Sequence, residues 1–155
     1  MKAEEFLERY GNITAEIRRK QRLKESLEAQ MLNVTSHLTP DKVQSSGSLQ
    51  KIAEAVDEAL DLEKEIKELF ILKNKVRKEI EFVLNQISVK FCEVLYEKYL
   101  ILTPEENIAA VIDRTEDTVS RQIEKGQEEV QCILDGKCGK MPPNAEGCGE
   151  MRQNA

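Results

Sequence analysis

The sequence predicts an all-α protein, in which a long antiparallel helical hairpin of coiled-coil character is followed by a C-terminal helix-turn-helix bundle. Charged residues make up 34% of the 155 residues and aromatic residues only 5%, with no Trp, a composition that favours long helices over sheet. Apolar residues recur at three- and four-residue spacing along two long segments. A cluster of turn-forming residues separates the two segments, and capping signals for shorter helices follow them.

Residues 1 to about 38 are expected to form the first helix. Ten positions in a 3-4 alternation hold eight apolar residues, with lysines at the other two: Phe6, Tyr10, Ile13, Ile17, Lys20, Lys24, Leu27, Met31, Val34 and Leu38. Gly11 interrupts the first turns, because glycine costs about 1 kcal/mol inside a helix. A helix with one apolar stripe cannot bury that stripe on itself, so this helix needs a partner.

The second long helix is expected over residues 49 to about 87, after a loop at residues 39–48 that contains Pro40 and a Ser/Gly run. Ser48 is the expected N-cap. Apolar residues keep helical spacing through this helix: Leu49, Ile52, Val56, Ala59, Ile66, Leu69, Val76, Ile80, Val83 and Ile87. Because a short loop joins two long helices, we expect residues 1–88 to form an antiparallel hairpin.

The order of charges predicts the register of this hairpin. With the turn centred near residue 43 or 44, residue i lies opposite roughly residue 87 minus i. The basic run Arg18–Lys24 then faces Glu63, Glu65 and Glu68, and the acidic cluster Glu4, Glu5 and Glu8 falls within about a turn of Lys75, Arg77 and Lys78. Each exposed pair is worth only about 0.2–1 kcal/mol, so the pattern sets register more than stability. A nucleic-acid patch is the alternative interpretation of the basic run.

Residues 89–135 are expected to form a helix-turn-helix domain, followed by a disordered tail at residues 136–155. Its first helix is defined by Phe91, Leu95, Tyr99 and Leu100. Two further helix starts follow, one with a capping box of Thr103 and Glu106 around Pro104, and one at Thr115. The turn between the last two helices is expected at Asp113, which tolerates a left-handed conformation. Apolar residues around this turn fit two helices that cross closely: Ile108, Ala109, Ile112, Val119, Ile123 and Val130.

Four parts of the chain carry a resemblance to a known family: Val43–Ser46, Ala59–Ile66, Leu95–Leu100 and Thr103–Lys125. Through them, residues 1 to about 133 resemble phage and prophage proteins of Gram-positive bacteria that have a sigma-factor region-4-like domain and lie near the ArpU-type late-gene transcription regulators. The resemblance implies an N-terminal helical hairpin joined to a DNA-binding helix-turn-helix. Basic positions of the motif are kept at Arg121 and Lys125.

The chain departs from the family at the start of the recognition helix. Glu116 and Asp117 stand where basic residues are common, and Gln122 replaces a residue that is usually apolar. Arg121 and Lys125 are four residues apart and converge on one helix face, because a helix turns every 3.6 residues. The residues expected to contact DNA are Arg114, Thr118, Arg121, Gln122 and Lys125.

Charge limits the DNA affinity that this domain would have. From Phe91 to Asp135, eleven acidic residues stand against four basic ones. Because phosphate contacts dominate DNA affinity, a single copy would bind duplex DNA weakly. A homo-oligomer formed through the helical hairpin would add contacts and offset this weakness.

The sequence thus favours a phage-type transcriptional regulator that binds double-stranded DNA through its helix-turn-helix. One alternative is an acidic protein-interaction module that contacts RNA polymerase or another phage protein without binding DNA. A second alternative is a small-terminase-like DNA packaging component, because such subunits also join a helix-turn-helix to coiled helices.

Other classes of protein fit the sequence poorly. An enzyme is not expected, because the chain has no glycine-rich phosphate loop and no evident pairing of a nucleophile with a base. With one His and four Cys that lack a CxxC spacing, we expect no metal and no cofactor. No apolar stretch approaches the ~18 residues of a membrane span, and no secretory leader is evident. We therefore expect a cytoplasmic protein of a bacterial or phage-infected host cell, with reduced thiols.

Overall fold

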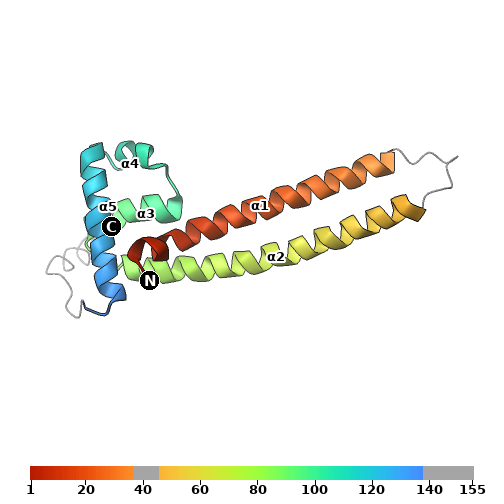
Figure 1. The fold of residues 1–155 in the computed structure, drawn as a ribbon. Helices are drawn as coiled ribbons and strands as arrows, with labels where there is room; N and C mark the ends of the chain where they lie inside the picture. The colour runs from red at the N-terminus through yellow and green to blue at the C-terminus, as the bar shows by residue number, and fades with distance from the viewer. Residues whose placement is uncertain (37–45, 138–155) are drawn as a thin grey trace, which may run out of the picture. The chain divides into compact units, whose positions relative to one another are not determined.

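The computed structural model describes residues 1–36 and 46–137, and these residues are helical apart from short turns (Figure 1). The elements are α1 (Ala3–Ser36), α2 (Ser46–Leu84), α3 (Val89–Tyr96), the π-helix η1 (Glu97–Ile101), α4 (Glu105–Val111) and α5 (Glu116–Leu134). The two long helices form an antiparallel pair, and the shorter helices pack together after them, so the predicted fold class is confirmed. Most of the expected loop and nearly all of the expected tail lie outside the described residues.

The described chain divides into two compact units. The first, here called the arm, is Ile13–Lys73 and contains parts of α1 and α2. The second, here called the head, joins Met1–Asn12 to the chain from Asn74 onward. The head therefore contains the start of α1, the end of α2 and all of the shorter helices.

Inside the arm, α1 presents the seam that the sequence predicts. Its seam positions from Ile13 to Val34 are all buried or half-buried, including the two lysines. Lys20 donates a hydrogen bond to Glu65 across the helix pair, with 2.5 Å between Nζ and Oε2, and this pair agrees with the predicted register to within two residues. Lys24 pairs along its own helix with Glu28. The seam lysines thus keep their charged ends at the rim while their alkyl chains cover apolar neighbours.

The seam of α2 differs in part from the prediction. Leu49 and Val56 are 65% and 40% exposed, so they lie outside the helix pair. The inward positions in the arm instead follow a strict 3-4 alternation of Ile52, Ala55, Ala59, Leu62, Ile66 and Leu69. The expected N-cap at Ser48 is wrong, because α2 already begins at Ser46.

The core of the head gathers apolar side chains from all of its helices. Its fully buried members are Leu7, Val76, Ile80, Leu84, Val94, Leu95, Ile108, Val119 and Val130. The start of α1 is fastened to the end of α5, because the backbone N–H of Ala3 donates to Oε1 of Gln131 at 2.7 Å. Arg9 adds an ion pair to Glu79 of α2 at 2.9 Å, which again agrees with the predicted register. The first turns of α1 are therefore part of the head core despite Gly11.

The capping box expected at Thr103 does not form. α3 continues into the π-helix η1, which ends at Leu102 in the left-handed conformation, with φ 63°. Thr103 closes this end by donating its backbone N–H to the carbonyl of Glu97 at 3.0 Å and its hydroxyl to the same residue's carboxylate at 2.8 Å. Because Thr103 is occupied there, α4 starts without a side-chain cap, and Pro104 is its N-cap rather than its first residue.

The cysteine environments differ along the described chain. Cys92 is half-buried in α3, as expected for a small residue near the core. Cys132 in α5 is disulfide-bonded, so the expectation of a reduced thiol is wrong at this position. Within residues 1–36 and 46–137, no helix is long and apolar enough to cross a membrane.

Candidate nucleic-acid interface

Two helices joined by a tight turn form the part of the head that the sequence assigns to DNA. α4 ends at Val111 and α5 begins at Glu116, and Asp113 between them adopts the left-handed conformation with φ 54°. The backbone N–H of Arg114 then bonds to the carbonyl of Ala109 at 2.9 Å, which closes the turn. The turn residue expected from the sequence is confirmed at Asp113.

Thr115 caps α5 as the sequence predicts. Its Oγ1 accepts a hydrogen bond from the backbone N–H of Thr118 at 3.3 Å, which satisfies one of the free donors of the first turn. The two threonine hydroxyls lie 2.7 Å apart and share a further hydrogen bond. Thr118 is therefore half-buried and held in the first turn, with its side chain engaged by the cap.

The inner face of α5 packs on α3 through a glycine. Val119, Ile123 and Val130 are buried with Gly126 on this face. A Cβ atom added to Gly126 would lie 2.8 Å from Cδ1 of Leu95 and 3.2 Å from Cβ of Phe91, closer than such atoms normally approach. The absence of a side chain at Gly126 thus lets α5 cross α3 at short range, and this crossing determines which face of α5 is exposed.

A carboxylate from α5 caps the start of α3. The backbone N–H of Ser88 donates to Oε2 of Glu129 at 2.9 Å, and its hydroxyl donates to Oε1 at 3.0 Å. Ser88 is the buried N-cap of α3 but makes no side-chain cap of its own, so Glu129 supplies the acceptor. A carboxylate at a helix N-terminus is also favoured by the helix dipole. This contact fixes α5 along its length relative to α3.

Two of the five expected DNA-contacting residues project from α5 without an ionic partner. Arg121 and Lys125 are both exposed, and within the described residues neither is in a salt bridge or in a hydrogen bond. They are separated by one helical turn and share a face of the helix. The structure therefore leaves both cations available to an anion in solution.

Two other residues expected to contact DNA, Arg114 and Gln122, instead form hydrogen bonds within the protein. Nη1 of Arg114 donates to Oε1 of Gln122 at 2.6 Å and to the carbonyl of Lys90 at 3.3 Å, and its Nη2 pairs with Glu93 at 3.1 Å. These contacts join the turn, α5 and α3. Arg114 and Gln122 thus use their polar atoms to position α5. Thr118, the fifth expected residue, is half-buried, and its hydroxyl bonds to Thr115.

Acidic residues flank the two unpaired cations. Glu116, Asp117, Glu124 and Glu128 are all exposed on α5. Asp117 lies one turn before Arg121, and Glu128 lies one turn after Lys125 on the same side of the helix. The outer face of α5 carries alternating charges rather than a continuous positive stripe, so its attraction for phosphate is local and screened by salt.

A buried tyrosine links η1 to the inner side of α5. Nε2 of Gln127 donates to the hydroxyl oxygen of Tyr99 at 2.6 Å. Burial raises the pKa of the Tyr99 phenol from its ordinary value, an effect strengthened by the carboxylates of Glu4 and Glu8 in α1 and opposed by the nearby ammonium group of Lys98. The phenol therefore stays protonated at neutral pH and acts as a structural group.

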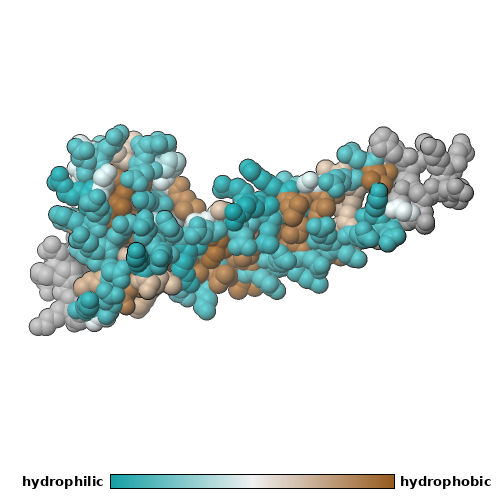
Figure 2. Space-filling model, viewed as in Figure 1, coloured by the Kyte–Doolittle hydropathy of each residue, from teal (hydrophilic) through white to brown (hydrophobic). Residues whose placement is uncertain are grey.

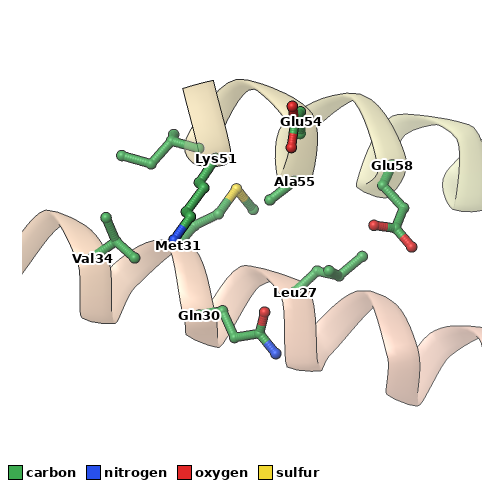
Figure 3. A pocket seen from close by; sticks show the side chains of 9 residues that line it. Leu27, Gln30, Met31, Val34, Lys51, Glu54, Ala55 and Glu58 are labelled. Atoms are coloured by element: carbon green, nitrogen blue, oxygen red, sulfur yellow. The ribbon is translucent and has the colours of Figure 1, made fainter. Parts of the chain in front are cut away.

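A hollow lies in the arm, between α1 and α2 (Figure 3). This hollow has a volume of about 290 Å³ and an apolar floor formed by Leu27, Met31 and Val34 of α1 with Ile52 and Ala55 of α2. Ala55 occupies a seam position with only a methyl group, which leaves space opposite Met31. Charged groups stand at the rim, from Lys51, Glu54 and Glu58. Within the part of the chain that the structure describes, no cluster of His, Cys, Asp or Glu is arranged to hold a metal ion.

The sequence patterns did not identify three residues that determine how α5 packs on α3 in the head. Gly126 and Glu129 fix the crossing of α5 on α3, and Ser88 receives the carboxylate. A glycine inside an amphipathic helix is a usable signal, because it costs stability unless a close approach requires it. The partner of Glu129 has no sequence signal, since Ser88 is distant along the chain.

Comparison with known proteins identifies no relative of this chain. No protein-family model, curated protein or solved structure matches the chain.

Proposed function

We propose that the chain is a helix-turn-helix protein that binds double-stranded DNA and regulates transcription, with α5 as its recognition helix. The observation that carries the proposal is the pair of exposed, unpaired cations Arg121 and Lys125 on the outer face of the helix that follows the tight turn. In helix-turn-helix proteins the second helix enters the major groove, where such side chains reach base edges or phosphates.

The internal contacts of the head support this role by fixing the recognition helix. Gly126 allows the close crossing on α3, and Arg114 ties the turn to Gln122 and Glu93. A helix held in this way loses little freedom on binding, so the backbone positions of Arg121 and Lys125 are fixed before DNA arrives. Thr118, next to Arg121 on the helix surface, is the third side chain that we assign to the interface.

The proposed affinity is modest, because two cations neutralise few phosphates and acidic residues surround them. Self-association through the hairpin would place two recognition helices on one duplex and raise the effective concentration of the second. The resemblance to phage proteins near the ArpU-type regulators supports a proposed role in phage or prophage gene expression, in a bacterial cytoplasm.

The acidic character of the head favours a second candidate, a protein-interaction module for a basic surface such as one on RNA polymerase. Arg114 is engaged internally, so the outer face of α5 offers more carboxylates than free cations. Electrostatic complementarity to a basic protein would then replace DNA contacts.

A salt-resolved binding measurement tests the first candidate. The full chain would be titrated into fluorescent random-sequence duplex DNA at 50 and 200 mM salt, alongside an Arg121→Ser/Lys125→Ser variant. We expect binding that weakens with salt, and a salt slope that falls by about 2 in the variant, about 1 for each lost phosphate contact. The matched control, Lys75→Ser/Lys78→Ser, removes the same charge from exposed positions of α2 and should leave the slope unchanged.

The same titration decides between the candidates. No duplex binding at the lower salt concentration, or equal effects of the two double variants, would contradict DNA recognition by α5. Retention of RNA polymerase by such a chain, lost when Glu124 and Glu128 are changed to Gln, would favour the protein-interaction module.

A further inference from the structure

A second apolar seam runs along α2 on a side that α1 does not cover. We call it the outer seam, and it consists of Leu49, Ala53, Val56, Leu60, Glu63, Lys67 and Phe70. Four of its members are large apolar residues that remain strongly exposed, at 65% for Leu49, 40% for Val56, 51% for Leu60 and 42% for Phe70. Figure 2 shows apolar surface along the long helices, interrupted by charged residues. Single exposed apolar residues are ordinary, but a row of them on one helix face marks an interaction surface.

The spacing of the outer seam is that of a coiled coil. Its members follow each other at intervals of four and three residues, as in the inner seam that packs on α1. The outer seam is offset from the inner seam by one residue, which is about 100° around the helix, so α2 can contact one neighbour through each seam. In the arm α1 occupies the inner seam, and the outer seam offers the same geometry to another helix.

We propose that the outer seam binds the outer seam of a second copy of this chain, with the two α2 helices antiparallel about a two-fold axis. An antiparallel arrangement centred between Leu60 and Glu63 maps the six seam members from Ala53 to Phe70 onto one another, and only Leu49 lies beyond the matched part. It places the small Ala53 opposite the large Phe70 of the second copy, and Leu60 opposite the alkyl part of Glu63. Such self-complementarity is what an isologous dimer interface requires. The inference deepens the self-association that the proposed function uses.

Charge complementarity selects this occupant. Asp57 and Lys64 flank the outer seam on its solvent side, and both are exposed and in no salt bridge within the described chain. In the proposed arrangement Asp57 of each copy lies within about a turn of Lys64 of the other, so the two-fold axis creates two ion pairs. A parallel two-fold arrangement would carry the Asp57 and Lys64 flanks of the two copies to opposite sides of the interface, so these ion pairs form only in the antiparallel arrangement.

The proposed register accommodates the polar pair within the outer seam. Glu63 and Lys67 form an ion pair along the helix, with 3.3 Å between Nζ and Oε1. In the proposed register Lys67 lies opposite Val56, which its alkyl chain covers while its ammonium group stays with Glu63 at the rim. Shifting the helices by one heptad in either direction would move Asp57 of one copy further along the helix from Lys64 of the other, so the flanking charges specify the alignment.

Reversal of the two flanking charges tests the interface. Sedimentation equilibrium of the full chain without DNA would measure the dimer dissociation constant of the wild type, Asp57→Lys, Lys64→Asp and the double variant. Each single change places like charges together at both symmetry-related contacts, and we expect it to weaken the dimer by about tenfold or more. The double variant restores opposite charges and should return to within about threefold of the wild type.

Two matched controls separate the outer seam from general effects. Asp61→Lys makes the same charge change at an exposed position on another face of α2 and should leave the mass unchanged. Leu60→Glu should give a monomer with unchanged helicity, whereas Phe82→Glu, at a 70% exposed apolar residue outside the seam, should not. The inference is overturned if the wild type is monomeric, as it would be if another protein covered the seam, or if the double variant fails to restore the dimer. A dimer that binds no duplex would keep this inference and contradict the proposed function, and a monomer that binds duplex would do the reverse.

Discussion

Gly126 of α5 lies directly against Leu95 of α3. A Cβ atom at Gly126 would lie 2.8 Å from Cδ1 and 3.1 Å from Cγ of Leu95, and Leu95 has no exposed surface to which it could retreat. The position of the outer face of α5 depends on this approach, because moving α5 away from α3 would also move Arg121 and Lys125.

We expect Gly126→Ala to destabilise the head by about 1 kcal/mol. Alanine gains about 1 kcal/mol of helix propensity, but overpacking in a closed core costs about 1–3 kcal/mol. Chemical denaturation followed by circular dichroism measures the difference. Gly47→Ala is the control, since nothing lies within 4 Å of a Cβ atom there and only the propensity gain remains. A stabilised Gly126→Ala variant would contradict the close approach.

The two glycines Gly11 and Gly126 show what a sequence can tell about packing. Both stand inside helices, where glycine is unfavourable, and both lie beside another element in the structure. A Cβ atom at Gly11 would meet only Cδ2 of Leu102, at 3.3 Å, and that side chain is partly exposed and free to shift. The sequence indicates a loss of helix propensity at both positions, whereas only the tertiary structure shows that close packing requires glycine at Gly126.

Asp113 provides a test of the turn itself. Its backbone is left-handed, with φ 54°, and its side chain is exposed, so substitutions there report mainly on backbone preference. We expect Asp113→Gly to raise the free energy of unfolding by about 0.5 kcal/mol and Asp113→Ala to lower it by about 1 kcal/mol. The order Gly, Asp, Ala in melting temperature checks the prediction, and an Ala variant at least as stable as the wild type would contradict it.

Seam periodicity predicted the long helices well, because each repeat of an antiparallel pair obeys the same rule. The prediction failed where a residue had two competing partners. Thr103 carries a capping-box sequence, yet its hydroxyl bonds to Glu97 and closes the preceding π-helix. Leu49 and Val56 have helical spacing but belong to the outer seam, and spacing alone does not distinguish two apolar faces of one helix.

The contact of Glu129 with Ser88 predicts a residue-specific loss of stability. Glu129→Ala removes the acceptor from a buried backbone N–H and a buried hydroxyl, and we expect it to cost about 2 kcal/mol. Glu129→Gln keeps one acceptor oxygen and should cost about 1 kcal/mol. Urea denaturation of these variants would be compared with Glu128→Ala, at the exposed neighbouring position, which should change stability by less than about 0.5 kcal/mol. Equal effects at the two positions would exclude the capping role.

The raised pKa of the Tyr99 phenol predicts that the protein loses stability at alkaline pH. Burial raises the pKa of its phenol above the ordinary 10.0, so the folded state holds the proton more tightly than the unfolded state. The stabilisation from this group is therefore fully present below pH 10.0 and is lost as the pH rises through the folded-state pKa. The melting temperature should fall as the pH is raised above about 10, and less steeply in Tyr99→Phe. The ammonium group of Lys98 also has a raised pKa and contributes in the same direction, so identical slopes for wild type and variant would assign the alkaline loss to other groups.

Substitution of Arg114 tests whether this residue positions α5 or contacts DNA directly. Its guanidinium contacts Gln122, Glu93 and the carbonyl of Lys90, so we expect Arg114→Ala to lower the free energy of unfolding by about 1 kcal/mol. Duplex affinity, measured well below the melting temperature, should then change by less than about threefold, since the exposed cations on α5 remain. Arg121→Ala should show the opposite pattern, with weaker DNA binding and unchanged stability, because its side chain makes no ion pair within the described chain. A large loss of affinity in Arg114→Ala without a loss of stability would mean that Arg114 leaves its internal partners to bind phosphate.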